Sequence, residues 1–194
     1  MRMSQGYAAF QNRVSASYDA YYVAGMVNGT ALVTGAPTIG AIFALPFVAP
    51  MGGILDRIVF RVTTGAGSSV ARVGIYANAA HNLALYPGAL LVDGGEKTTT
   101  GTGVTHSTTI SVRVEPGELY WFTYLCGTAA PTLRCLAIAG CWPIMGLNAN
   151  LAATPQIGWS VTQAYGALPA AFPVDYSAFI TAVPVPAIGV RFSA

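Results

Sequence analysis

Apolar and polar residues alternate strictly through several short segments of the chain. In residues 54–62, Ile58, Phe60 and Val62 share one parity, and Arg57 and Arg61 occupy the other. Residues 71–76 and 110–114 repeat the pattern. A period of two with one polar side is typical of a half-buried antiparallel strand. These segments predict an antiparallel sheet with one face on a core.

Residues 119–126, which read LYWFTYLC, are apolar on both parities. This favours a central strand, or a strand whose outer face is covered by a partner. Further strands are predicted at residues 133–139, 158–162, 179–183 and 188–192. Dipeptides with Pro or Gly predict turns at Pro87-Gly88, Asp93-Gly94-Gly95 and Pro116-Gly117.

Two regions depart from this strand pattern. Residues 142–174 have few strand signals, which indicates either an extended loop over the sheets or the main subunit contact. In residues 1–20, the larger apolar residues Tyr7, Phe10, Val14 and Tyr18 are spaced among polar ones. That spacing fits either a short amphipathic helix or a free arm. We therefore expect an N-terminal docking arm at 1–20. Residues 21–194 would form an all-β, jelly-roll-like antiparallel sandwich.

Charge is unusually sparse and unevenly spread. Charged residues make up 8% of the chain, and no Asp, Glu, Lys or Arg lies in residues 20–55 or 135–174. An ordinary soluble domain has about 25% charged residues. Since such a chain has little charge to keep its copies apart, other subunits are expected to cover part of its surface.

A membrane could also cover apolar surface, and the mean hydropathy is +0.54. The longest apolar run, residues 39–50, contains Pro46 and is shorter than the about 20 residues that a spanning helix needs. We therefore expect no membrane insertion. The first residues carry no apolar signal segment, which favours folding in a cytoplasm.

Groups that perform chemistry are few and scattered. His81 and His106 have no neighbouring ligand at metal-binding spacing, so no metal site is expected and both are interpreted as surface imidazoles. Cys126, Cys135 and Cys141 are interpreted as buried thiols, with their redox state left open. No nucleophile elbow or phosphate-binding loop is present. We expect no cofactor and no enzyme, with a glycosidase-type carboxylate pair as the remaining catalytic alternative.

Aromatic residues offer one candidate ligand site. Tyr86, Trp159 and Tyr165 could form a face on which sugar rings stack, although such residues are more often core or interface anchors. Nucleic-acid binding is not expected, because the basic residues form no stripe in the sequence.

Five short motifs resemble a domain of tailed-bacteriophage virion proteins. The resemblance covers roughly residues 21–140 and is a pattern match without a catalytic signature. Its motifs are the DRI step at 56–58, ARVGIY at 71–76, LYPGALL at 85–91, GGE at 94–96 and LYWF at 119–122. Similar strands occur in secreted sugar-binding modules.

The resemblance implies a jelly-roll-type sandwich on the exterior of a phage particle, made in the host cytoplasm. Its function would be that of a head decoration protein or a short fibre component. It would form homotrimers and attach to capsid or tail proteins. The alternative is a receptor- or carbohydrate-binding module at a fibre tip, with a host surface glycan as partner. The expected contacts are the arm residues Tyr7, Phe10, Val14 and Tyr18 and the late apolar residues Trp142, Ile144, Met145 and Leu147.

Overall fold

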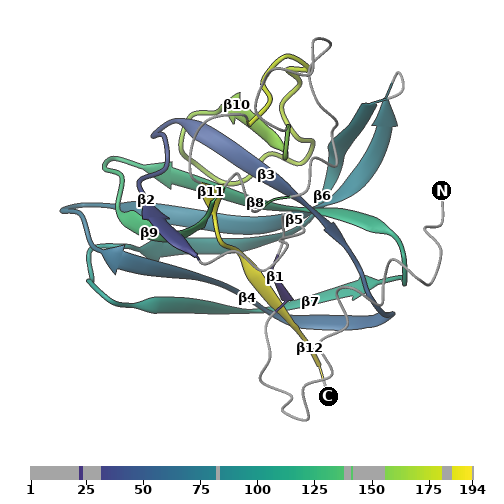
Figure 1. Cartoon of the computed structure of the whole chain (residues 1–194), viewed down its shortest axis with the longest axis horizontal. Coiled ribbons are helices and arrows are strands. Elements are labelled where there is room, and N and C mark those ends of the chain that lie inside the picture. Colours follow the sequence, from purple (N-terminus) through teal and green to yellow (C-terminus); the bar gives the residue numbers. More distant parts are fainter. Residues whose placement is uncertain are drawn as a thin grey trace.

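The alternating segments form two antiparallel sheets that pack face to face in the computed structural model of the chain (Figure 1). The predicted fold class, an all-β antiparallel sandwich, is confirmed. Among the described residues there is no helix, and hence none long and apolar enough to cross a membrane. The structure describes residues 22–23, 32–81, 84–137, 141, 156–180 and 185–193.

The described residues contain twelve strands. Their bounds are β1 Tyr22–Val23, β2 Val33–Gly35, β3 Ala41–Val48, β4 Gly53–Thr64, β5 Val70–His81, β6 Ala84–Thr98, β7 Thr105–Val114, β8 Leu119–Gly127, β9 Thr132–Leu136, β10 Trp159–Thr162, β11 Val185–Pro186 and β12 Gly189–Phe192.

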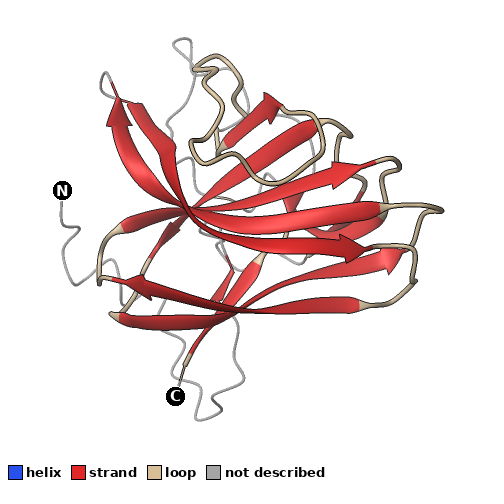
Figure 2. Cartoon of the chain, turned by 180° about the vertical axis from the view of Figure 1, so that it is seen from behind, coloured by secondary structure: helices blue, strands red, loops and turns tan. Residues whose placement is uncertain are grey.

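The strands divide into a five-stranded and a seven-stranded sheet, which lie as two layers in Figure 2. The five-stranded sheet has the order β10-β3-β8-β5-β6. The seven-stranded sheet has β1-β12-β4-β9-β11 in line, with β7 beside β4 and β2 beside β9. From β3 to β9 the chain changes sheet at every connection except the β5–β6 hairpin. Contacts between strands distant in sequence therefore dominate the fold.

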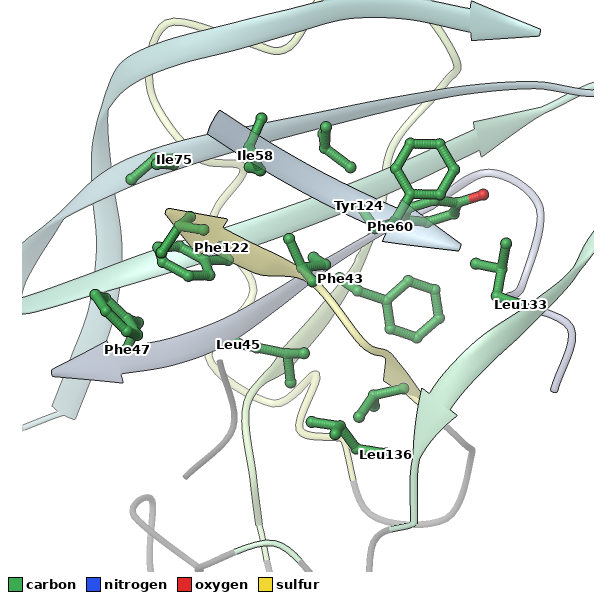
Figure 3. Packing of buried hydrophobic residues seen from close by; sticks show 14 of the residues in the cluster. Phe43, Leu45, Phe47, Ile58, Phe60, Ile75, Phe122, Tyr124, Leu133 and Leu136 are labelled. Carbon is green, nitrogen blue, oxygen red and sulfur yellow. The ribbon is translucent and has the colours of Figure 1, made fainter. Parts of the chain in front are cut away.

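The main core lies between the two sheets (Figure 3). Phe47 of β3 stacks on Phe122 of β8 with ring centroids 4.5 Å apart. Phe60 of β4 meets Tyr124 of β8 edge to face at 5.4 Å, which joins the two sheets. Burying one such large apolar side chain contributes about 1.5–3 kcal/mol. The inward-facing side chains of the strands thus supply most of the buried apolar surface.

Strand β8 confirms the prediction of a central strand that is apolar on both faces. It lies between β3 and β5. Phe122 and Tyr124 face the core between the sheets, whereas Trp121 and Leu125 belong to a second apolar cluster on the outer face. The cover over that outer face comes from the chain itself.

Strand β3 changes the interpretation of the first charge-free stretch. All eight of its residues, AIFALPFV, are buried, since the two clusters cover its opposite faces. This part of residues 20–55 lacks charge because it is interior. The need for an external cover is therefore limited to the exposed residues on either side of β3.

Two of the three predicted turns are wrong. Pro87-Gly88 and Asp93-Gly94-Gly95 lie inside the continuous strand β6, which pairs with β5 through three register shifts. Such shifts mark bulges, where an inserted residue is accommodated and Gly can adopt a positive φ, as Gly95 does at 75°. The turn at Pro116-Gly117 is confirmed, with Gly117 at a φ of 77°.

Candidate functional site

The predicted site residues fall into two groups. Tyr86, Trp159 and Tyr165 lie in the described structure, on or beneath the outer face of the five-stranded sheet. The arm residues Tyr7, Phe10, Val14 and Tyr18, and the late apolar residues Trp142, Ile144, Met145 and Leu147, lie outside the described residues. Among the described residues, the outer faces of the two sheets therefore carry the candidate sites.

A long segment covers the outer face of the five-stranded sheet. Residues 163–180, here called the strap, leave β10 and cross to the opposite edge of the sheet, as the long loops of Figure 2 show. There Leu90 N–H donates to Ala170 O at 2.9 Å, and Phe172 N–H donates to Gly88 O at 3.0 Å. These bonds surround an antiparallel bridge between Ala89 and Ala171. The strap thus covers the free edge of β6.

The strap then returns to β10. Ser160 N–H donates to Ala178 O at 2.8 Å, and Ile180 N–H donates to Gly158 O at 2.9 Å. An isolated bridge joins Trp159 to Phe179. Since unpaired strand edges invite association with other chains, the strap protects both edges of this sheet. For the part of residues 142–174 that is described, the interpretation as a loop over the sandwich fits.

The tip of the β5–β6 hairpin folds back over the same face. Strand β5 pairs with β8 only as far as Ala77, whereas its pairing with β6 continues to His81. Trp159 Nε1–H nevertheless donates to Leu85 O at 3.1 Å. In sheet order β10 and β6 are four strand spacings apart, about 19 Å. The contact therefore requires the hairpin to bend, and the bulges in β6 permit that bend.

Aromatic residues fill the space between the sheet, the hairpin and the strap. The rings of Tyr86 and Trp159 are 4.6 Å apart, and Trp159 stacks on Phe179 at 4.4 Å. Tyr86 O–H donates to Pro173 O at 2.7 Å and accepts from Asp175 N–H at 2.9 Å. Tyr86 is 3% exposed and Trp159 is 0% exposed. The two rings hold the strap in place and do not present an open stacking face for a sugar.

Tyr165, the third predicted ligand residue, is half-buried at the rim of this region. Its O–H donates to Glu96 Oε2 at 3.0 Å. Burial, followed by the neighbouring Glu96 carboxylate, raises the pKa of Tyr165 to about 12. Because Gly127 lacks a side chain, the Tyr165 ring can lie directly against the end of β8, where a Cβ atom would overlap it.

A charged group fastens the middle of the strap. Arg72 Nη1 and Asp93 Oδ2 form an ion pair at 2.8 Å between β5 and β6. The same Asp93 oxygen accepts from Leu168 N–H at 3.0 Å, and its other oxygen accepts from Gly95 N–H at 2.8 Å. Asp93 thus connects the sheet, the bulge and the strap. These contacts assign the local charges a structural role.

The thiols and the described histidine have no catalytic geometry. Burial raises the pKa of Cys126 to about 11, of Cys135 to about 12 and of Cys141 to about 11, so all three are protonated at neutral pH. The prediction of three buried thiols is confirmed, and they are free. Across the described ranges, no three His, Cys, Asp or Glu side chains gather as metal ligands.

His106 is not the surface imidazole that we predicted. It is half-buried and stacks on Phe60, with ring centroids 4.9 Å apart. Its side chain points inward from β7 and lies at the edge of the core. The sequence did not indicate this, because both neighbours, Thr105 and Ser107, are polar. Burial, followed by the charge of Lys97, lowers its pKa. His81 is the last residue of β5, and its side chain lies outside the described structure.

The outer face of the seven-stranded sheet differs from the strap-covered face. Arg61, Arg113 and Arg134 are each flanked by core residues of the opposite parity, so they lie on the outer side of the sheet. Arg57 and Arg191 lie on the same side: Arg57 precedes the core residue Ile58, Arg191 follows the core residue Val190, and the two are partners in the β4–β12 register. We call this surface the arginine face, formed by Arg57, Arg61, Arg113, Arg134 and Arg191. Residues far apart in the sequence converge here, since β4, β7, β9 and β12 are neighbours in the sheet.

Hydroxyl side chains accompany the arginines. Along β7 the exposed positions Thr105, Ser107, Thr109 and Ser111 alternate with residues turned inward. Arg61 Nη1–H donates to Thr105 Oγ1 at 2.9 Å. This surface combines fixed positive charge with neutral hydrogen-bonding groups. Sequence reasoning missed it because strand pairing, which the sequence does not display, brings these residues together.

No family model matches the chain, and no curated protein is significantly similar to it.

Proposed function

We propose that this chain is a non-enzymatic structural subunit on the exterior of a tailed-bacteriophage particle. It would be a head decoration protein or a short fibre component, and it would act by forming trimers and attaching to capsid or tail proteins. The sequence motifs that resemble phage virion domains support the assignment to a phage particle. The confirmed β-sandwich supports the architecture.

The distribution of exposed apolar side chains carries the assembly part of the proposal. Large exposed apolar residues concentrate where charge is absent, which is typical of surfaces that partners cover. Six of the nine such residues in the described structure fall within residues 20–55 or 135–174: Leu32, Val33, Ile39, Met51, Ile54 and Val174.

Light scattering on the purified chain tests the assembly. We expect a stable mass of about three times the 20.0 kDa of one chain. A monomer that persists at all concentrations would contradict self-assembly in solution. Mass spectrometry of purified particles from the encoding phage tests the location. We expect many copies of the chain per particle, and its absence from intact particles would overturn the proposal.

Removal of residues 1–20 tests the arm. Because the strands and both apolar clusters lie beyond this segment, we expect the truncated chain to fold with an unchanged circular dichroism spectrum and unfolding midpoint. We also expect it to be absent from particles assembled in its presence. Full incorporation of the truncated chain would contradict a docking role for Tyr7, Phe10, Val14 and Tyr18.

The receptor-binding alternative requires an accessible aromatic surface. Tyr86 and Trp159 are buried, and Tyr165 is bound to Glu96. Since no contact in the described structure favours a sugar site, we rank this function second. Binding on a glycan array, lost on a Tyr165→Ala change, would reverse that order.

A further inference from the structure

We propose that the arginine face is a docking surface for an acidic protein partner, whose Asp and Glu side chains pair with its guanidinium groups. This inference goes beyond the virion assignment and does not depend on it. It rests on the arrangement of the five arginines and on the groups that surround them.

The face carries uncompensated positive charge. Its five guanidinium groups stand against two carboxylates, Asp56 and Glu115, which leaves a formal charge of +3. Asp56 pairs with Arg191, and Glu115 pairs with Arg113 at 3.1 Å. Within the described residues, Arg57, Arg61 and Arg134 form no ion pair with a carboxylate. By contrast, the formal charges on the strands of the five-stranded sheet sum to zero, because Arg72 and Lys97 are matched in number by Asp93 and Glu96.

These three arginines lie near one another. Arg57 and Arg61 both project outward from β4 and are separated by four residues, about 13 Å. Arg134 lies on β9 beside Leu133, which is paired with Val62 of β4. The three charges thus form a compact group at one part of the sheet, a size that one partner surface can match.

The pairing of Arg191 with Asp56 illustrates how a carboxylate can fit this surface. Arg191 Nε–H donates to Asp56 Oδ1 at 2.9 Å, and Arg191 Nη2–H donates to Asp56 Oδ2 at 2.6 Å. The planar guanidinium therefore forms a bidentate pair with the carboxylate, as arginine does at protein interfaces. Arg57 is the direct neighbour of Arg191 in the β12–β4 register, and the charges of both lower the pKa of Asp56.

Nucleic acid fits the same surface less well. A net charge of +3 releases few counterions, whereas effective backbone binding uses about 6–10 phosphate contacts. The outward positions of β4 and β7 hold no aromatic ring on which a base could stack. An acidic protein needs neither a stacking ring nor a long series of phosphate contacts, because separate carboxylates can pair with individual arginines.

Fluorescence anisotropy with two labelled probes tests the proposal on the full-length chain. The probes are an oligoglutamate peptide and a DNA duplex of the same total charge, each measured at low and at physiological ionic strength. We expect the peptide to bind more tightly than the duplex and to weaken as salt screens the charges.

A triple substitution, Arg57→Gln, Arg61→Gln and Arg134→Gln, removes the three unpaired charges while keeping long polar side chains. Three surface ion pairs together change affinity by about threefold to a hundredfold, so we expect a loss in that range for the peptide. Lys97→Gln on the other sheet is the matched control and should bind as the parent chain does. A single Arg61→Glu change at an exposed position provides a second test if the triple variant does not fold.

Three results would overturn the proposal. One is that the peptide does not bind at low ionic strength. Another is that the triple variant, or Arg61→Glu, binds the peptide as the parent chain does. The last is that the duplex binds more tightly than the peptide, which would identify a phosphate-binding surface instead. None of these results would bear on the presence of the chain in phage particles.

Discussion

The outer faces of the two sheets differ: one is covered by other segments of the chain, and the other carries the arginine face. The five-stranded sheet is buried on both sides, with its edges and outer face covered by the strap and by the bent β5–β6 hairpin. Its charged strand residues are balanced, and Asp93 is engaged inside the chain. No described segment covers β4 and β7 of the seven-stranded sheet in this way, and this sheet carries the arginine face. The difference shows that one sheet completes its contacts internally, whereas the other has charge left for a partner.

Replacing Trp159 with Ala should have the largest effect on stability. Trp159 is fully buried and joins β10, the hairpin and the strap through Phe179, Tyr86 and Leu85 O. Truncating a buried Trp leaves a cavity and costs about 3–5 kcal/mol. Urea unfolding measures this loss. Val174→Ala is the control, because Val174 is 69% exposed and should change stability by less than about 0.5 kcal/mol. Equal effects of the two changes would mean that the strap is not packed as described.

Asp93→Asn should have the next largest effect. It removes the ion pair with Arg72 and weakens the acceptors of Leu168 N–H and Gly95 N–H, at a cost of about 1–3 kcal/mol. We expect protease cleavage within residues 163–180 at concentrations that leave the parent chain intact. Asp175→Asn is the control, because that exposed carboxylate accepts bonds from residues two and three positions along the chain, Ser177 and Ala178, and forms no described ion pair. Resistance of the Asp93 variant would show that other contacts hold the strap.

A change in pH should have a smaller effect, through His106. Its pKa is lower in the folded chain than the usual 6.5, so the unfolded chain takes up a proton first as pH falls. Stability should therefore decline below about pH 6.5. Asp56 has a lowered pKa and contributes stability above its usual 3.8, so that contribution is lost only at more acidic pH.

Unfolding of the parent chain and of His106→Gln between about pH 7.5 and about pH 5.5 isolates this contribution. We expect the parent chain to lose more stability than the variant over this interval. Parallel pH profiles would show that His106 is equally easy to protonate in the folded and unfolded chains.

The smallest effect on stability should come from the arginine face. The triple change of Arg57, Arg61 and Arg134 to Gln removes no described ion pair, so we expect a shift within about 0.5 kcal/mol. Thermal unfolding measures it. A large loss would mean that these arginines stabilise the sheet itself, and the contrast between the two sheets would then disappear.

The sequence predicted the fold class and most strands because inward and outward positions alternate with a period of two. It failed where one strand bends. Pro87, Gly88 and Gly94 read as turn residues, yet they mark bulges in β6, and only pairing with β5 distinguishes the two cases. Of the strand predicted at residues 179–183, the described residues show one isolated bridge, between Phe179 and Trp159. Residues 181–184 lie outside the described structure.

The candidate sites were harder to predict because they depend on contacts distant in sequence. Tyr86 and Trp159 were correctly grouped, but their burial follows from the strap and hairpin, which no local pattern indicates. The arginines appeared scattered because their strands become neighbours only in the sheet. Local periodicity shows which way a side chain faces, while strand order decides which other side chains it meets.

Cryo-electron microscopy of purified particles from the encoding phage tests the central claim most directly. We expect copies of the sandwich on the particle exterior, with the arginine face against an acidic surface of a neighbouring protein and the strap away from that contact. Intact particles that lack the chain would contradict the virion assignment. Particles in which the strap is covered and Arg57, Arg61 and Arg134 face solvent would contradict the roles given to the two sheets.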